Sequence, residues 1–152
     1  MAPFELALSP AQLDQTCRAL AQCNQASARY GLVLSGTQIA ALARRRAETL
    51  RSTGRVEFGE GVLPQLARAF CSSPCIQPAD YADTLAELQD LFYRFKGDCR
   101  ERLADDELID AMALVFQRTG GSLEFLAGME PEELCLIART GSLDGTRLDG
   151  EM

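Results

Sequence analysis

The chain has 152 residues, of which 47% are hydrophobic, and a formal net charge of −7 at pH 7. It contains no histidine, which excludes Ser-His-Asp and Cys-His catalysis, histidine-ligated zinc and the usual proton shuttle of neutral pH. The acidic balance argues against broad binding to nucleic acid or to anionic membranes, because phosphate contacts need a surplus of positive charge. A chain of this length buries enough surface to fold as one domain without a metal or a disulfide.

Capping signals predict the first two helices. A serine N-cap, a proline at the first helical position and a glutamine at N3 open a helix over residues 10–30, which Gly31 ends. The same capping logic opens a second helix over residues 36–53, which Gly54 ends. Its inner stripe is predicted to consist of Ile39, Leu42, Ala43, Ala47 and Leu50.

Apolar periodicity predicts the remaining helices, at residues 61–71, 78–96, 105–118, 122–127 and 131–139. The clearest pattern repeats at steps of four and three, at Tyr81, Leu85, Leu88, Phe92 and Phe95. The sequence therefore predicts an all-α, single-domain bundle of about five main helices plus two short C-terminal helices. This domain is expected to span residues 1–139, with a flexible C-terminal tail at 140–152.

Two short segments, residues 4–8 and 55–58, alternate apolar and other residues as strands do. If the first two helices pack antiparallel, the start of the first lies beside the end of the second. The geometry therefore permits a two-stranded ribbon between these segments.

The six cysteines are expected to be reduced thiols. The start of the chain lacks the basic region and apolar stretch of a signal peptide, and no apolar run approaches the roughly 18 residues of a membrane span. We therefore expect a protein of the cytoplasm, where thiols stay reduced. Cys71 and Cys75 are the only close pair, and zinc would need two further thiolates. We expect no metal and no cofactor, with a redox-switched Cys71–Cys75 pair as the alternative.

The most unusual local run is residues 54–61, where three glycines, an arginine and two acids precede a helix. Glycine backbone amides could approach a phosphate or a carboxylate, with arginines adding positive charge, although the acids oppose an anion. A helix cap, a short strand and a turn are the alternative explanation of this run. The candidate anion or polar site comprises Arg51, Arg55, Glu57, Glu60 and Tyr81.

The arginine run at residues 44–46 spreads over about 200° of helix and so cannot form one flat patch. Arg44, Arg51 and Arg55 lie near one face, at spacings of seven and four. These three are the arginines to test as anion contacts. A solvated face that pairs with Glu48 is the alternative.

Six segments carry a resemblance to known sequences, at residues 54–64, 69–74, 81–89, 92–96, 105–109 and 121–126. Together they resemble an uncharacterised family of small bacterial all-helical proteins, a domain of unknown function. The resemblance covers nearly the whole chain. It implies no activity and supplies no catalytic residue.

Our leading functional expectation is a helical binding or regulatory module whose groove accepts a protein segment or a small ligand. The alternative is a small enzyme using carboxylate, tyrosine or arginine residues near residues 51–61 and helix 78–96. A large cleft lined by Arg55, Glu57 and Tyr81 would favour the enzyme, whereas an exposed apolar patch would favour the binding module. The expected partner is a protein or a small ligand, without nucleic acid or membrane, and the chain is expected to be a monomer or homodimer.

Overall fold

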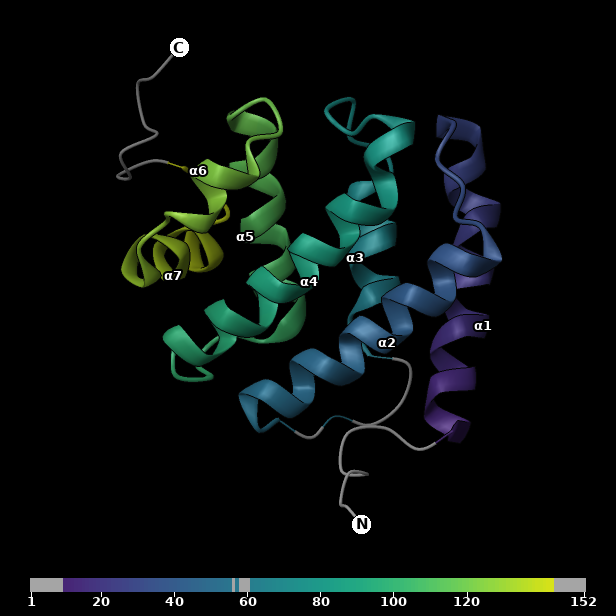
Figure 1. The fold of residues 1–152 in the computed structure, drawn as a ribbon. Coiled ribbons are helices and arrows are strands. Elements are labelled where there is room, and N and C mark those ends of the chain that lie inside the picture. Colours follow the sequence, from purple (N-terminus) through teal and green to yellow (C-terminus); the bar gives the residue numbers. More distant parts are fainter. Residues whose placement is uncertain (1–9, 56, 58–60, 144–152) are drawn as a thin grey trace. The chain divides into compact units, whose positions relative to one another are not determined.

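The computed structural model describes residues 10–55, 57 and 61–143. These residues form seven α-helices and two short 3₁₀-helices, with no strand among them. The α-helices are α1 Pro10–Ser27, α2 Gly36–Thr53, α3 Leu63–Phe70, α4 Tyr81–Asp98, α5 Asp105–Arg118, α6 Leu123–Ala127 and α7 Pro131–Thr140, and the 3₁₀-helices are η2 Ala28–Tyr30 and η3 Pro78–Asp80 (Figure 1). The predicted all-α class is confirmed, with its five main and two short C-terminal helices.

The chain divides into two compact units, Met1–Asp90 and Leu91–Met152, with the boundary inside α4. In the first unit α1 packs against both α2 and α3, and in the second unit α5 packs against α6 and α7 (Figure 1). No helix in the described ranges is both long and apolar enough to cross a membrane.

Two predictions concern parts of the chain that lie largely outside the described residues. The ribbon between 4–8 and 55–58 involves residues 4–8, 56 and 58, none of which is described. The tail at 140–152 overlaps the described residues only as far as Leu143, and α7 itself extends to Thr140. The ribbon, the tail and the 1–139 domain boundary therefore stay predictions.

The bounds of α2 follow from its local sequence. The Ser35 hydroxyl accepts a hydrogen bond from the Gln38 backbone N–H at 3.1 Å, and the Gln38 side chain accepts one from the Ser35 N–H at 2.9 Å. This capping box satisfies two amides that would otherwise lack a partner. Gly54 ends the helix at a φ of 71°, a left-handed conformation that favours glycine.

The other boundaries differ slightly from the predictions. The predicted first helix changes from α to 3₁₀ geometry at Ala28, and the fourth continues one residue past Gly97. The third begins at Leu63 rather than at residue 61, because Gly61 has a left-handed φ of 86° that no α-helix contains.

The predicted inner faces of the third, fourth and fifth helices are confirmed by burial of their apolar side chains. The buried residues on them include Leu63, Leu66 and Phe70 of α3, Tyr81, Leu85, Leu88, Phe92 and Phe95 of α4, and Leu108, Ile109, Met112, Val115 and Phe116 of α5. The α2 stripe is wrong at one position, because Ala47 is only half-buried and Arg46 is fully buried in its place.

Side chains of α1 hold the segment that links α1 to α2. The Asn24 amide donates to the Leu34 carbonyl at 3.0 Å and accepts from the Leu34 N–H at 2.9 Å. Ser27 donates from its hydroxyl to the Leu32 carbonyl at 2.6 Å. These bonds satisfy backbone groups that belong to no helix, so the link is fixed against α1.

Candidate functional site

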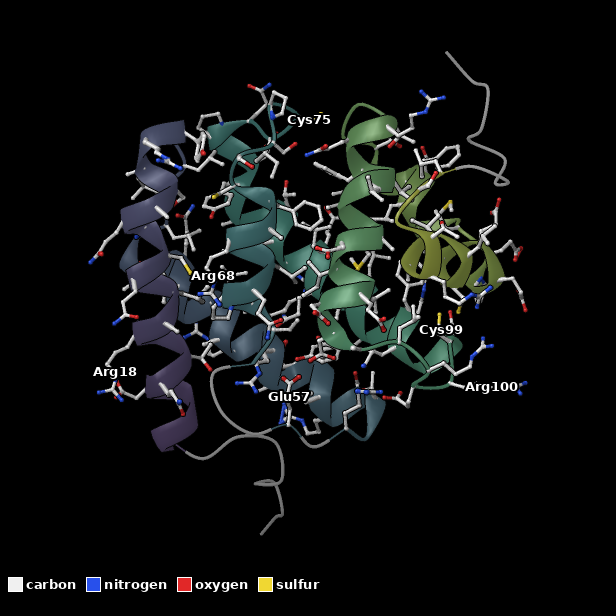
Figure 2. All side chains as sticks on the ribbon, turned by 180° about the vertical axis from the view of Figure 1, so that it is seen from behind. Arg18, Glu57, Arg68, Cys75, Cys99 and Arg100 are labelled. Atoms are coloured by element: carbon white, nitrogen blue, oxygen red, sulfur yellow. The ribbon has the colours of Figure 1, made fainter. Side chains whose placement is uncertain are left out.

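Arg46 is the centre of a buried polar junction in the first unit. Its side chain is 0% exposed, and it lies on the inner face of α2 between α1 and the segment after α2. Nε donates to Glu57 Oε1 at 3.0 Å, and Nη2 lies 2.9 Å from the same oxygen (Figure 2). Nη1 donates to Thr16 Oγ1 at 2.8 Å. Burial of an arginine is costly unless its charge is paired and hydrogen-bonded, and both conditions are met here.

Gly61 lies directly against this guanidinium. A Cβ atom at Gly61 would lie 2.4 Å from both Cζ and Nε of Arg46, closer than non-bonded atoms approach. The glycine in the unusual 54–61 run therefore allows the backbone to contact the arginine side chain. The contact explains this glycine by packing against Arg46, without an anion.

The residues of the predicted anion site occupy different environments. Arg51 is exposed near the end of α2, and Arg55 is half-buried just beyond it. Glu57 is paired with Arg46, a partner that the sequence did not predict. Glu60 lies outside the described residues. Tyr81 is buried at the start of α4, with only 1% exposed.

Tyr81 lies near Ser27 and Cys23 of α1 and near Cys71 at the end of α3. Burial raises the pKa of Tyr81 from 10.0 to about 12, while the Ser27 hydroxyl lowers it and the nearby Cys71 and Cys23 thiols raise it further. Within the described ranges, its hydroxyl makes no hydrogen bond of acceptable geometry. A buried phenol with a raised pKa stays protonated at neutral pH, so it is poorly suited to act as a base.

The structure also brings together a pair of thiols that the spacing of the cysteines did not suggest. Cys99, which follows α4, contacts the Pro131 carbonyl with its sulfur at 3.9 Å (Figure 2). Cys135 lies one turn further along α7, and its side chain leans back toward that first turn. Burial and a hydrogen bond with Cys135 raise the pKa of the Cys99 thiol to about 11. Such a thiol is a poor nucleophile at neutral pH.

The cysteines of the predicted redox pair differ in exposure. Cys71 is buried, and its sulfur contacts the Arg68 carbonyl at 3.7 Å. Cys75 is half-buried, and both thiols are free. Arg68 extends from α3 toward α1, where its Nη1 lies 3.8 Å from the Cys23 sulfur (Figure 2). In the described part of the chain no group of three or more Cys, Asp or Glu residues is placed to hold a metal.

Lys96, the single lysine of the chain, links the end of α4 to the start of α5. Its ammonium donates to the Leu103 carbonyl at 2.7 Å and lies 2.9 Å from a carboxylate oxygen of Asp105. With 12% of its side chain exposed and both partners close, it fixes the turn between the helices.

A hollow of about 200 Å³ lies between α2 and the first half of α4. Its lining combines one stripe from each helix: Gln38, Ala41, Leu42, Arg45, Ala82, Asp83 and Ala86. Leu42 and Ala86 are buried and form its floor, whereas Gln38, Arg45 and Asp83 are exposed and form its rim. Three of the lining residues are alanines, Ala41 of α2 and Ala82 and Ala86 of α4, whose side chains are small.

An ion pair joins the two helices beside this hollow. Arg45 Nε donates to Asp90 Oδ2 at 3.2 Å, and Thr49 donates from its hydroxyl to Asp90 Oδ1 at 2.9 Å. Asp90 of α4 is therefore bound twice by α2. These bonds fix the spacing of the helices at the edge of the hollow.

Comparison of the chain with models of known protein families identifies its family. The model of DUF6323, a family of unknown function, matches residues 19–144, well over half of the chain. The chain belongs to this family. The match confirms the resemblance expected from the sequence, and neither the curated proteins nor the solved structures gave a match.

The DUF6323 match includes both features described above, with one exception. Every residue lining the hollow lies within 19–144, as do Arg46, Glu57 and Gly61. Thr16, the α1 partner of Arg46, precedes the matched range. The family itself assigns no activity to either feature.

Proposed function

We propose that this DUF6323 member is a helical binding module, and that the hollow between α2 and α4 receives a side chain from a segment of another protein. The observation that carries the proposal is the hollow itself, with its buried apolar floor of Leu42 and Ala86 and its exposed polar rim. An apolar floor supplies burial energy, and a polar rim supplies orientation.

The size of the hollow favours a protein segment over a small ligand. Sites for drug-sized molecules and cofactors measure roughly 300–1,000 Å³. At about 200 Å³ this hollow is smaller, although it accommodates one aliphatic side chain. Binding through a single anchor with a polar surround is a common way for a helical surface to recognise a segment of a partner.

The alternative of a small enzyme near residues 51–61 and helix 78–96 gains no specific support. Glu57 is occupied by Arg46, and Tyr81 is buried with a raised pKa. The described hollow is lined by a different set from the Arg55, Glu57 and Tyr81 cleft expected of such an enzyme.

The proposed module acts in the bacterial cytoplasm as a monomer or homodimer, and it binds neither nucleic acid nor membrane. The net charge of −7 supports the absence of nucleic-acid and membrane binding, because it repels phosphate-rich surfaces. The free cysteines support a cytoplasmic location, because a reducing compartment keeps thiols unpaired.

The proposal is tested by selecting displayed random peptides for binding to the full chain. Selected peptides are then measured against a variant with the hollow filled, Ala41→Gln together with Ala82→Gln. The matched control is Ala21→Gln together with Ala28→Gln, at two exposed alanines of α1 and η2. Melting temperatures show that both variants are folded.

We expect the filled variant to lose at least tenfold in affinity for the selected peptides, while the control binds as the unaltered chain does. Amide chemical shifts should move at Gln38, Leu42 and Ala86 on peptide addition. Peptides that bind both variants equally would show that the hollow is not the site, and the proposal would then fail.

A further inference from the structure

The charge around the hollow is predominantly negative. Arg45 is the cation in the lining, and its pKa is raised by the hydrogen bond to Asp90, then by the negative charges of Asp90, Glu87 and Glu48. Three carboxylates thus act on one guanidinium. An anionic group entering the hollow would meet this excess of negative charge.

Arg45 is already engaged by the protein itself. Its guanidinium lies against Asp90, whose other oxygen is held by Thr49 of the same helix. Asp90 occupies Nε and Nη2 of the guanidinium, so a ligand carboxylate could reach Arg45 only at Nη1, close to the negative charge of Asp90. The single cation of the lining therefore contributes little attraction for anions.

Two carboxylates of α4 have no such partner. Asp83, on the rim, and Glu87, one turn further along, are both exposed. Neither forms an ion pair in the parts of the chain that the structure describes. Residues four apart lie on the same side of a helix, so both are positioned to meet a partner that lies along α4.

Resting on the proposed function, we infer that the segment bound at the hollow is basic, with one aliphatic anchor flanked by lysine or arginine residues. The anchor fills the hollow over Leu42 and Ala86. The flanking cations pair with Asp83 on the rim and with Glu87 one turn further along α4, the two carboxylates without an ion pair among the described residues.

A second copy of this chain fits the hollow less well than a basic partner. Two copies related by a two-fold axis would bring the same acidic rim against itself, since an isologous contact uses one patch twice. Each copy also carries a net charge of −7, which opposes association.

The test uses two pools of labelled peptides of about a dozen residues, each with a central leucine. The other positions draw on lysine, serine and alanine in the basic pool, and on glutamate, serine and alanine in the acidic pool. Binding to the full chain is followed by fluorescence anisotropy. We expect the basic pool to bind at least tenfold more tightly and to weaken as salt rises from about 50 to about 200 mM.

Two variants separate charge from shape. Asp83→Asn with Glu87→Gln should lower affinity for the basic pool roughly fivefold to tenfold, because it removes one charge on the rim and one beyond it on α4. The matched control, Asp106→Asn with Asp110→Asn, removes two exposed carboxylates four apart on α5 and should leave binding unchanged. Asp83 and Asp106 each lie in the first turn of their helix, so the two variants lose the same helix-dipole interaction.

The outcomes distinguish this inference from the proposed function. If peptides bind in a way that filling the hollow abolishes, but the acidic pool binds as tightly as the basic one, the hollow remains a binding site and its basic preference is wrong. If filling the hollow changes neither pool, both proposals fail. If sedimentation shows a dimer that the Ala41→Gln and Ala82→Gln variant dissociates, a second copy occupies the hollow and the inference is overturned.

Discussion

Arg45 and Arg46 are neighbours in α2, yet they belong to two regions with opposite character. Arg46 lies in the buried junction, where Thr16 and Glu57 satisfy it and Gly61 packs on it. Arg45 lies on the open rim of the hollow, where 45% of its side chain is exposed beside Asp90. The junction connects two helices and the segment beyond α2, whereas the rim leaves a surface open to solvent.

The comparison shows how the same side chain serves either stability or recognition according to its burial. A fully buried charge is costly to leave unpaired, so removing one partner of a buried ion pair lowers the free energy of unfolding substantially. An exposed charge pair is screened by water and contributes little to stability, although it still steers a charged partner. Substitutions in the buried junction should therefore lower the free energy of unfolding more than substitutions on the exposed rim.

The largest effect is expected for Arg46→Ala. It removes a buried guanidinium and its long aliphatic stem, and it leaves Thr16 and Glu57 without their shared partner. We expect the free energy of unfolding to fall by about 3 kcal/mol, the lower end for breaking a buried pair, because Glu57 is partly exposed and can be rehydrated. Denaturant unfolding measures the change.

The control for this experiment is Arg46→Met, which keeps most of the volume and removes the charge. Methionine leaves Glu57 without its cation, as alanine does, but it keeps the packing of the long side chain, so it should cost less than alanine by that packing contribution. A methionine variant as unstable as the alanine variant would mean that the ion pair, rather than packing, holds the junction together.

The next largest effect is expected for Gly61→Ala. The new Cβ would meet Arg46 at 2.4 Å, and alanine would be strained at a φ of 86°. We expect a loss of about 2–3 kcal/mol, of which the backbone accounts for roughly 1–2 kcal/mol. Gly54→Ala is the matched control, since its φ is 71° with nothing within 4 Å of a Cβ.

A double variant identifies the source of this cost. In a chain that already carries Arg46→Ala, the Gly61 substitution should cost no more than the Gly54 substitution does. An undiminished cost in that background would show that the guanidinium and Gly61 are not coupled, contrary to the contact described.

An intermediate, pH-dependent effect is expected for Tyr81→Phe. The folded-state pKa of about 12 exceeds the unfolded value of 10.0, so the folded state retains a proton that the unfolded state loses. The stabilisation is therefore complete below pH 10 and is lost as pH rises toward 12, by an amount on the order of 2 kcal/mol. Phenylalanine should flatten this part of the stability profile.

The same variant should change little at neutral pH. The Tyr81 hydroxyl has no hydrogen-bond partner of good geometry in the described ranges, so its removal leaves no new unsatisfied group. Chemical unfolding at pH 7 and at several values between 10 and 12 checks both statements. Identical alkaline profiles for the two proteins would contradict the burial of this phenol.

The smallest effect is expected for Arg45→Ala. Its partner Asp90 is 38% exposed and keeps its hydrogen bond from Thr49, so the loss should be about 0.2–1 kcal/mol and should shrink further in high salt. A loss as large as that of Arg46→Ala would erase the distinction between rim and junction.

The sequence predicted most of the fold, because capping and apolar spacing are local signals. The bounds of α2 and α5 match the predictions at both ends. The α3 start was placed too early, since a glycine in the sequence does not reveal its φ. Position 46 lies three residues after Ala43 and four before Leu50, which is the spacing of an inner face, but an arginine is rarely fully buried and so gives no apolar signal there.

The polar sites were harder to predict, because each depends on partners far apart in the sequence. Glu57 reaches Arg46 across the end of α2, and Asp90 reaches Arg45 from a helix 45 residues away. The available signal for the hollow was an alanine one turn from a charged residue on each helix. These pairs are Ala41 with Arg45 on α2 and Ala86 with Asp83 on α4. Only the packing of α2 against α4 shows that these two stripes face each other.

The pairing of Asn24 with Leu34 has a consequence for solvent exchange. The Leu34 N–H belongs to no helix, yet it donates to the Asn24 side chain and its residue is 3% exposed. Its deuterium exchange should therefore be as slow as that of helical amides, although its neighbour Val33 is 56% exposed. A single asparagine thus gives this link the protection that a strand would obtain from an adjacent strand.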